Sequence, residues 1–244
     1  MNSSGVSETI GYIFVTAIVI VAISTVYVST YDMLQDTSED NKVEGLRQSF
    51  KRVQNVLSLS TYGGAPLQSI QVEAQGGMFT VQNETQVKVV ANSSTVFDEY
   101  IGSFNYSYGD MEVCLEGGAI WEDYYGHKSA VSSPRIFIHT TSTQDPSQAS
   151  KTVVIVVLNK LRGDFSVAGE GSLDLFFNKT TVNTTTFSEP GNVTLNVTSS
   201  YAELWNNFFE ELPGDSYMDG DKVSFQSYYD KLIITEYEVR ISAR

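Results

Sequence analysis

The chain has 244 residues, of which 41% are apolar and 12% aromatic. This is enough for one or two domains with a packed core, so we exclude global disorder. The 29 acidic residues outnumber the 15 basic ones, and the net charge of −14 would repel nucleic-acid phosphates, so we expect no nucleic-acid partner. The single cysteine, Cys114, excludes an intramolecular disulfide.

The first predicted element is a long apolar helix near the N-terminus. No charged residue occurs between Glu8 and Asp32. The 23 residues from 9 to 31 would form a helix of about 34 Å, enough to cross a hydrocarbon core. This stretch has no polar face, which is typical of burial in lipid or in a bundle of like helices. A signal-peptide core is shorter and usually follows basic residues, which are lacking here.

The helix is expected to continue beyond the membrane as an amphipathic extension over residues 32–61. The apolar residues in this part recur at spacings of three and four: Val43, Leu46, Phe50, Val53 and Leu57. Such a stripe packs against a partner helix or a sheet. Gly63 and Pro66 are predicted to end the helix, which would then run nearly continuously over residues 6–61.

After Pro66 the pattern changes to the alternation of half-buried strands. It recurs at residues 69–73, 86–89, 111–115, 135–139, 172–176, 192–197 and 231–242. Residues 151–158 are continuously apolar at their centre, which predicts a central strand covered on both faces. A short helix over about 201–212 is indicated by a capping box, Ser200 and Glu203, and by an apolar face that contains Trp205. We therefore predict an α+β protein: a long N-terminal hydrophobic helix, then a mainly antiparallel β-sandwich-like head over residues 62–244.

Glycosylation motifs indicate where this head is located. Besides Asn2, seven asparagines of the β region begin an Asn-X-Ser/Thr sequence: Asn83, Asn92, Asn105, Asn178, Asn183, Asn192 and Asn196. Attachment of a glycan requires an exposed position in a secretory compartment, although asparagine is also common in ordinary turns. Together with the acidity of the region, the motifs favour an extracellular head. The basic residues after the apolar span argue weakly for the opposite orientation.

The segment Gly5-Val6-Ser7-Glu8-Thr9-Ile10-Gly11 and the apolar span that follows resemble the class III signal and N-terminal helix of archaeal type IV pilins and archaellins. The resemblance covers about the first 35 residues. It implies a signal remnant over residues 1–5, removed by cleavage between Gly5 and Val6. It also implies a β-rich head. Asn2-Ser3-Ser4 stands where the family usually has lysine or arginine before the glycine.

The mechanism that this resemblance implies is self-assembly. A uniformly apolar helix that leaves the membrane is stable in water only when copies of itself cover it, which gives a helical homopolymer with the heads outside. Four small residues, Gly11, Ala17, Ala22 and Ser24, would let helices approach closely, although such residues are ordinary in any membrane span. Glu8 could pair with the amino terminus of an adjacent subunit, or simply complement the helix dipole.

Other chemistry receives little support from the sequence. We find no phosphate-binding loop and no catalytic motif, and His127 and His139 lie far apart, so we expect neither an enzyme nor a cofactor other than N-linked glycans. Asp215, Asp219 and Asp221 form an acidic stretch that could invite calcium, but the spacing does not fit an EF-hand, and a solvated turn is the simpler interpretation. Cys114 is expected to be a small buried apolar residue.

Two functional hypotheses follow. The first is a structural subunit of an extracellular archaeal filament for adhesion, surface coating or motility, anchored in the membrane before assembly. The second is a single-pass, membrane-anchored cell-surface binding protein, or a minor pilin-like component, whose head recognises a ligand on a surface or host cell.

Overall fold

The computed structural model describes residues 3–141 and 150–244, with the side chains of residues 10–30, 41–141 and 150–244. It divides into two compact units, Met1–Leu46 and Arg47–Arg244. The boundary falls inside the long helix, not after it at residues 61 and 62. The reason is that the last turns of this helix carry buried apolar side chains, such as Phe50 and Val53, and so belong to the packed head.

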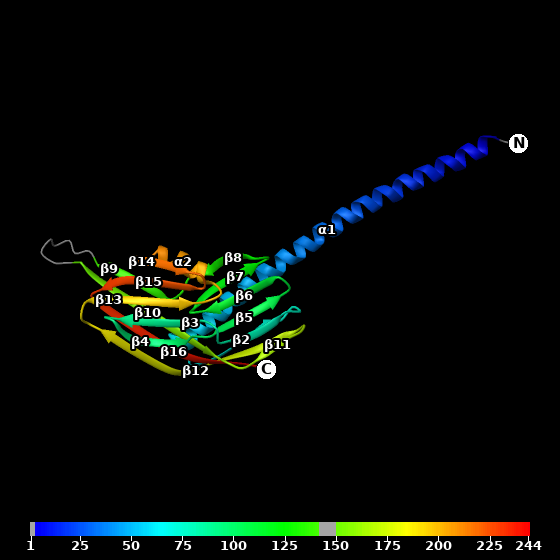
Figure 1. The fold of residues 1–244 in the computed structure, drawn as a ribbon. Coiled ribbons are helices and arrows are strands. Elements are labelled where there is room, and N and C mark those ends of the chain that lie inside the picture. The colour runs from blue at the N-terminus through cyan, green and yellow to red at the C-terminus, as the bar shows by residue number, and fades with distance from the viewer. Residues whose placement is uncertain (1–2, 142–149) are drawn as a thin grey trace. The chain divides into compact units, whose positions relative to one another are not determined.

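Helix α1 spans Ser3–Thr61 without interruption (Figure 1). Its sequence contains no proline before Pro66, so nothing removes a backbone donor along its length. The helix ends where predicted: the Gly63 amide donates to the Leu59 carbonyl at 3.1 Å. Gly64 then adopts a φ of 72°, a left-handed conformation that glycine reaches without steric cost.

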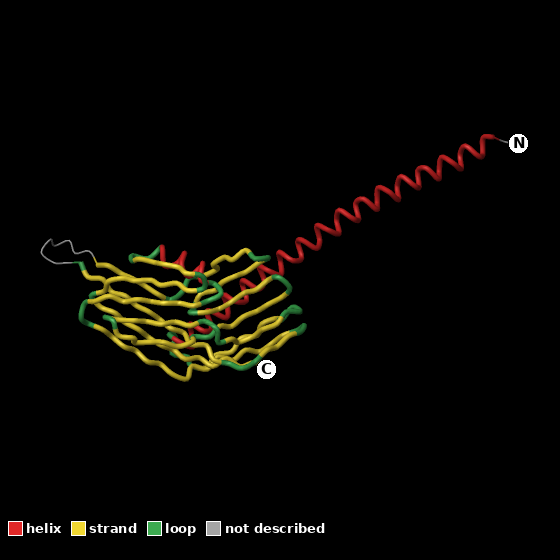
Figure 2. The backbone as a smooth tube through the Cα atoms, viewed as in Figure 1, coloured by secondary structure: helices red, strands yellow, loops and turns green. Residues whose placement is uncertain are grey.

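The head consists of three sheets joined mostly by short loops (Figure 2). In spatial order, the first sheet contains β1 (Leu67–Glu73), β12 (Ser172–Phe187), β16 (Lys231–Ala243), β10 (Lys151–Arg162) and β9 (Ile136–Thr141). The second contains β11 (Ser166–Ala168), β2 (Met78–Gln82), β5 (Ser103–Tyr108), β6 (Met111–Glu116), β7 (Ala119–Tyr124) and β8 (His127–Ser132). The third contains β14 (Asp215–Asp219), β15 (Lys222–Tyr229), β13 (Gly191–Thr198), β3 (Gln86–Ala91) and β4 (Ser94–Tyr100).

The predicted fold class is confirmed: an α+β fold with an N-terminal apolar helix and a head of mostly antiparallel sheets. Among the described strand pairs, β10 and β16 alone run parallel. The predicted central strand at residues 151–158 is β10, and it lies inside the first sheet between β16 and β9.

The long strands of the first sheet change the face that they bury. In β10, Val154, Val156 and Leu158 lie on one face and join the main core, whereas Asn159 and Leu161 are buried on the opposite face. The paired strand β16 makes the same change, from Leu232 and Ile234 to Val239 and Ile241. The change in β10 occurs after Leu158. Within residues 151–158 the apolar side chains on the face opposite Val154 are half-buried, so both faces are at least partly covered, which accounts for the continuous apolar run. Successive side chains of a strand point to opposite faces, and the two halves of β10 bury different faces. The two halves therefore pack against different neighbours.

Helix α2 spans Ala202–Glu210, close to the predicted 201–212, and buries Leu204, Trp205 and Phe209. The predicted capping box is wrong, because the N-cap residue is Tyr201 and it makes no side-chain capping bond. Instead, the Ser199 hydroxyl accepts a hydrogen bond from the Tyr201 amide at 3.0 Å and donates to Glu116. The sequence pattern selected Ser200 because it could not show that a buried carboxylate fixes the serine before it.

Candidate assembly site

The stretch Ile10–Thr30 of α1 is long and apolar enough to cross a membrane, and every side chain in it is exposed. Its 21 residues are about 31 Å long as a helix. The hydroxyls of Thr16 and Thr25 donate to the carbonyls of Tyr12 and Val21, so these polar groups are satisfied within the helix. Soluble monomers rarely expose a continuous apolar surface of this size. We therefore expect lipid or another protein surface to shield this stretch from water.

A recess of about 350 Å³ interrupts this apolar surface. It is lined by Phe14, Ala17, Ile18, Val21 and Ala22, all on one helix face. Ala17 and Ala22 create the recess because their side chains end at Cβ. Ala17 and Ala22, two of the four small residues predicted to let helices approach, therefore line the same recess. Gly11 is open, with nothing within 4 Å of the place where a Cβ would stand.

The remaining predicted positions are Ser24, the cleavage position at Gly5 and Val6, and Glu8. Ser24 is exposed and does not line the recess. Gly5 and Val6 lie in the first turns of α1, since the helix begins at Ser3, but their side chains lie outside the described residues. The side chain of Glu8 lies outside them as well. Glu8 is beyond the first turn of the uncut chain.

The last turns of α1 pack against the second sheet through aromatic rings. Phe50 stacks on Phe104 and Phe79 with ring centroids 5.5 and 6.4 Å apart. Val53 and Leu57 on the same helix face are also buried. Full burial of such side chains stabilises a fold by roughly 1.5–3 kcal/mol each, so this face of the helix is a permanent part of the head. These positions belong to the stripe that the sequence predicted.

Polar contacts that sequence reasoning missed fix the register of the helix on this sheet. Arg47 binds Glu122 at two points, with Nε–Oε1 at 2.7 Å and Nη2–Oε2 at 2.8 Å. Two turns further on, the buried Gln54 amide donates to the Gly118 carbonyl at 2.7 Å and to the Ser132 hydroxyl at 2.6 Å. The partners are 64 to 78 residues apart in sequence, so spacing gives no signal of these contacts.

A buried carboxylate, Glu116 on β6, connects the second sheet to α2. Its side chain is 1% exposed and accepts hydrogen bonds from four neutral donors. Trp205 Nε1 donates at 2.7 Å, Trp121 Nε1 at 3.0 Å and Ser199 Oγ at 2.7 Å, and the fourth donor is the Thr85 hydroxyl. The four donors come from separate segments. This carboxylate therefore ties them to one point.

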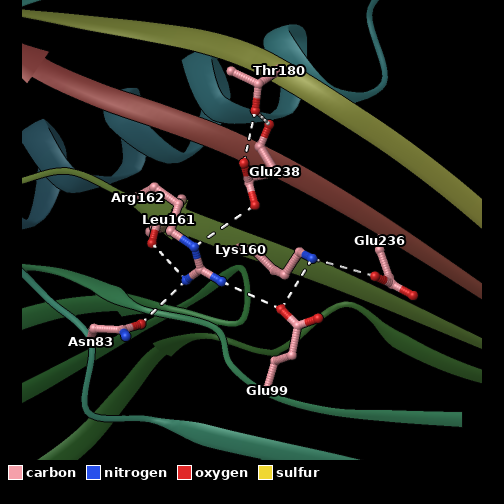
Figure 3. Close-up of polar contacts among 8 residues, drawn as sticks. All are labelled: Asn83, Glu99, Lys160, Leu161, Arg162, Thr180, Glu236 and Glu238. Carbon is pink, nitrogen blue, oxygen red and sulfur yellow. Dashed lines mark hydrogen bonds and ion pairs between the residues drawn. The ribbon is translucent and has the colours of Figure 1, made fainter.

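A second polar cluster joins side chains of β10 and β16 in the first sheet to Glu99 of β4 (Figure 3). Lys160 and Arg162 on β10 share the Glu99 carboxylate at 3.3 and 3.6 Å. Glu236 and Glu238 on β16 contact Lys160 Nζ at 3.5 Å and Arg162 Nε at 3.8 Å, respectively. The cluster neutralises most of its own charge and joins β4 to the first sheet, so we interpret it as structural.

A third polar feature is a ladder of opposed side chains in the second sheet. Glu112 on β6 lies directly opposite Asp123 on β7, and Asp123 lies opposite Lys128 on β8. Burial raises the pKa of Glu112, and the nearby Asp123 carboxylate raises this pKa further, while Lys128 lowers it. Burial also raises the pKa of Cys114, and the neighbouring carboxylates add to that effect, so the thiol stays protonated.

The predicted glycosylation positions do not share one environment. Five asparagine side chains are exposed and one is half-buried: Asn83, Asn92, Asn178, Asn183 and Asn192, then Asn196. Asn105 is 5% exposed on the interior strand β5, and its amide donates to the Gln82 side chain. Asn105 therefore lacks the exposed amide that attachment to the folded chain requires. Its sequence motif carries no information on burial.

The acidic stretch proposed for calcium is a strand and a turn. Asp215 and Asp219 lie at opposite ends of β14, which places their Cα atoms about 13 Å apart. Two carboxylates at that separation do not converge on one ion. Within the described ranges, no group of three or more histidine, cysteine, aspartate or glutamate side chains could hold a metal ion.

Comparison with known proteins places these features in a family. A family model described as "Family of unknown function (DUF7289)" matches residues 5–242, and the chain belongs to this family. A protein of Archaeoglobus fulgidus, described as uncharacterized, is 24% identical over 279 residues, which cover 92% of this chain and 90% of that protein. No solved structure matches the chain. The family match extends over both the apolar helix and the β-rich head.

Proposed function

We propose that this chain is the structural subunit of an extracellular, type IV pilus-like archaeal filament. Copies of the helix would cover one another in the filament core, and the heads would face the medium. The observation that carries the proposal is the stretch Ile10–Thr30, where every side chain is exposed and no charged residue occurs. A heterologous contact that repeats from copy to copy without closing into a ring gives such a polymer.

Two further features support this proposal. The recess at Ala17 and Ala22 offers a place for a large side chain of a neighbouring helix, and close packing is the main source of helix association once lipid is the competing environment. The ring stacking of Phe50 and the Arg47–Glu122 pair keep the base of the same helix in the head. Force on a filament core would therefore pass into a rigid domain.

The alternative function is a single-pass membrane-anchored surface binding protein or a minor pilin-like component. The length of Ile10–Thr30, about 31 Å as a helix, matches one hydrocarbon core and so favours retention in lipid equally well. In that case the apolar surface would be covered by acyl chains and not by other copies.

Shearing of intact cells separates the two functions. A filament subunit leaves the cell surface on shearing and pellets as high-mass polymer, and its mature chain begins at Val6 when pilin-type processing occurs. A membrane-anchored protein stays with the membranes until detergent is added. Recovery of the whole pool in the detergent extract as single chains would contradict the filament proposal.

A further inference from the structure

An open groove of about 470 Å³ lies where the first and third sheets of the head meet. Strands of both sheets contribute polar side chains to it: Thr140, Thr152, Asn192, Asp215, Gln226 and Tyr228. Its volume is within the usual range for small-molecule sites, roughly 300–1,000 Å³. The groove is separate from the helix that we propose for assembly.

The aromatic side of the groove is Tyr228, whose side chain is 52% exposed. The Tyr228 hydroxyl donates to Asp230 Oδ1 at 3.2 Å, and the other oxygen of Asp230 accepts the Thr152 amide at 2.6 Å. The Ser227 hydroxyl donates to the Pro213 carbonyl at 2.8 Å, which holds the loop before β14 against β15. The ring and the wall beside it are therefore fixed before any ligand arrives.

Several polar groups of the groove remain available. The side-chain amides of Asn192 and Gln226 hydrogen-bond to no other described residue, and the Asp215 carboxylate likewise has no described partner. The backbone of Asn192 is held in place, because its amide donates to Asn92 Oδ1 at 3.2 Å. The groove thus offers amide donors, amide and carboxylate acceptors and one aromatic face.

The chemistry of these groups restricts the ligand. Among the described residues that line the groove none is basic, so an anion would meet only the carboxylate of Asp215. An apolar ligand would leave the amides and hydroxyls without partners, at a cost for each buried polar group. A divalent cation would find a single uncommitted carboxylate. A neutral polyhydroxy compound can exchange hydrogen bonds with every group and place its C–H face on the ring.

We propose that this groove binds a neutral oligosaccharide, with a sugar ring stacked on Tyr228 and hydroxyls bound by Gln226, Asn192 and Asp215. Two sources can supply it. Asn192 begins a glycosylation motif and lines the groove, so a glycan attached there can occupy the groove of its own chain. A polysaccharide of another surface has the same chemistry. The proposal does not depend on filament assembly.

The test uses the full chain in detergent micelles, produced in a host that adds no glycan. Saturation-transfer NMR measures binding of neutral hexose and N-acetylhexosamine trisaccharides, with trigalacturonate as the anionic comparison. We expect transfer to a neutral probe and little to trigalacturonate. Tyr228→Ala should weaken binding about tenfold or more, and Gln226→Ala should weaken it several-fold. Tyr217→Ala is the matched control, because Tyr217 is 69% exposed on the adjacent strand β14 and does not line the groove.

Absence of transfer to every neutral probe, or binding that Tyr228→Ala leaves unchanged, would overturn the proposal. The chain purified from a glycosylating host then identifies the source. If the Asn192 glycan occupies the groove, the wild-type chain does not bind the added probe, whereas Thr194→Ala does, because this variant removes the glycosylation motif and leaves Asn192 in the groove. If the ligand comes from another surface, both chains bind it equally.

Discussion

The Arg47 guanidinium and the Glu122 carboxylate form a two-point ion pair, with both contacts between 2.7 and 2.8 Å, at the place where α1 meets the second sheet. Glu122 is buried, and Arg47 places the opposite charge beside its carboxylate. The pair sets the rotation of the helix about its axis, because a planar guanidinium accepts a carboxylate in few orientations. Together with the Gln54 hydrogen bonds, this pair fixes the position of α1 along and around its axis on the second sheet, which apolar contacts alone would not do.

Arg47→Ala is expected to destabilise the head by about 2 kcal/mol, because it leaves the buried Glu122 carboxylate without its cation. Urea unfolding of the detergent-solubilised chain, followed by the fluorescence of Trp121 and Trp205, measures this change. Arg52→Ala is the matched control: Arg52 is exposed one turn further on and donates to Ser49, so its removal should cost less than about 0.5 kcal/mol. Equal effects of the two variants would contradict the role given to the pair.

Glu116→Gln is expected to destabilise the chain by about 2 kcal/mol. The amide keeps one acceptor oxygen for the three donors at Oε1, but its uncharged NH2 group replaces the Oε2 acceptor and faces the Thr85 hydroxyl that donates there. Near-ultraviolet circular dichroism should report looser packing of the Trp121–Trp205 pair, whose ring centroids lie 5.8 Å apart. The exposed Glu203→Gln serves as the control. An unchanged unfolding midpoint in Glu116→Gln would show that Glu116 does not tie the segments together.

Glu112 predicts a pH dependence of stability. Its pKa is raised above the ordinary value of 4.5, so the folded state binds this proton more tightly than the unfolded state does. The ionised group therefore destabilises the fold at neutral pH. The contribution of Glu112 to the free energy of unfolding therefore becomes less unfavourable as the pH falls through the raised pKa of the folded state. The penalty is gone below about 4.5, where the group is protonated in both states.

Glu112→Gln should accordingly stabilise the chain at pH 7 by roughly 0.5 kcal/mol and flatten its stability profile on the acid side of neutrality. Unfolding midpoints between pH 4 and 8 measure the profile. Glu73→Gln, on an exposed position of β1, should leave the profile unchanged. A loss of stability at pH 7 in Glu112→Gln would reverse the assigned sign.

Glycan attachment should follow exposure and not the motif alone. In protein from a glycosylating host, we expect modification among the exposed asparagines, such as Asn178 and Asn183, and none at Asn105. Peptide mass spectrometry measures occupancy at each site. Abundant glycan on Asn105 would mean that attachment precedes folding or that β5 is not an interior strand.

The sequence predicted the elements whose periodicity is regular. The apolar stripe through Phe50, Val53 and Leu57 and the apolar face of α2 follow from spacing, and the interior strand β10 follows from its continuous apolar run. It did not predict the change of buried face within β10 and β16, because that depends on which neighbours cover each half. The unit boundary at Arg47 also depends on packing, since the helix itself shows no break there.

Features built from distant residues had no local signal. Glu116 collects donors up to 89 residues away, and Tyr228 and Thr140 come together only when the first and third sheets meet. The Ser200–Glu203 motif pointed to the wrong serine for the same reason. Within the apolar stretch Ile10–Thr30, by contrast, Ala17 and Ala22 were selected from residue size alone, and both line the recess.

Photocrosslinking from Ile18, which lines the recess in the stretch Ile10–Thr30, identifies what covers this helix on the cell. A photoreactive residue at this position, activated on intact cells, reacts with whatever covers the apolar helix. If copies of the helix cover one another, we expect a ladder of chain–chain adducts in the sheared fraction, joined within residues 10–30, and no adducts from the same residue placed at the exposed Tyr217. Adducts with lipid alone, in every fraction, would contradict the claim that copies of this helix cover one another.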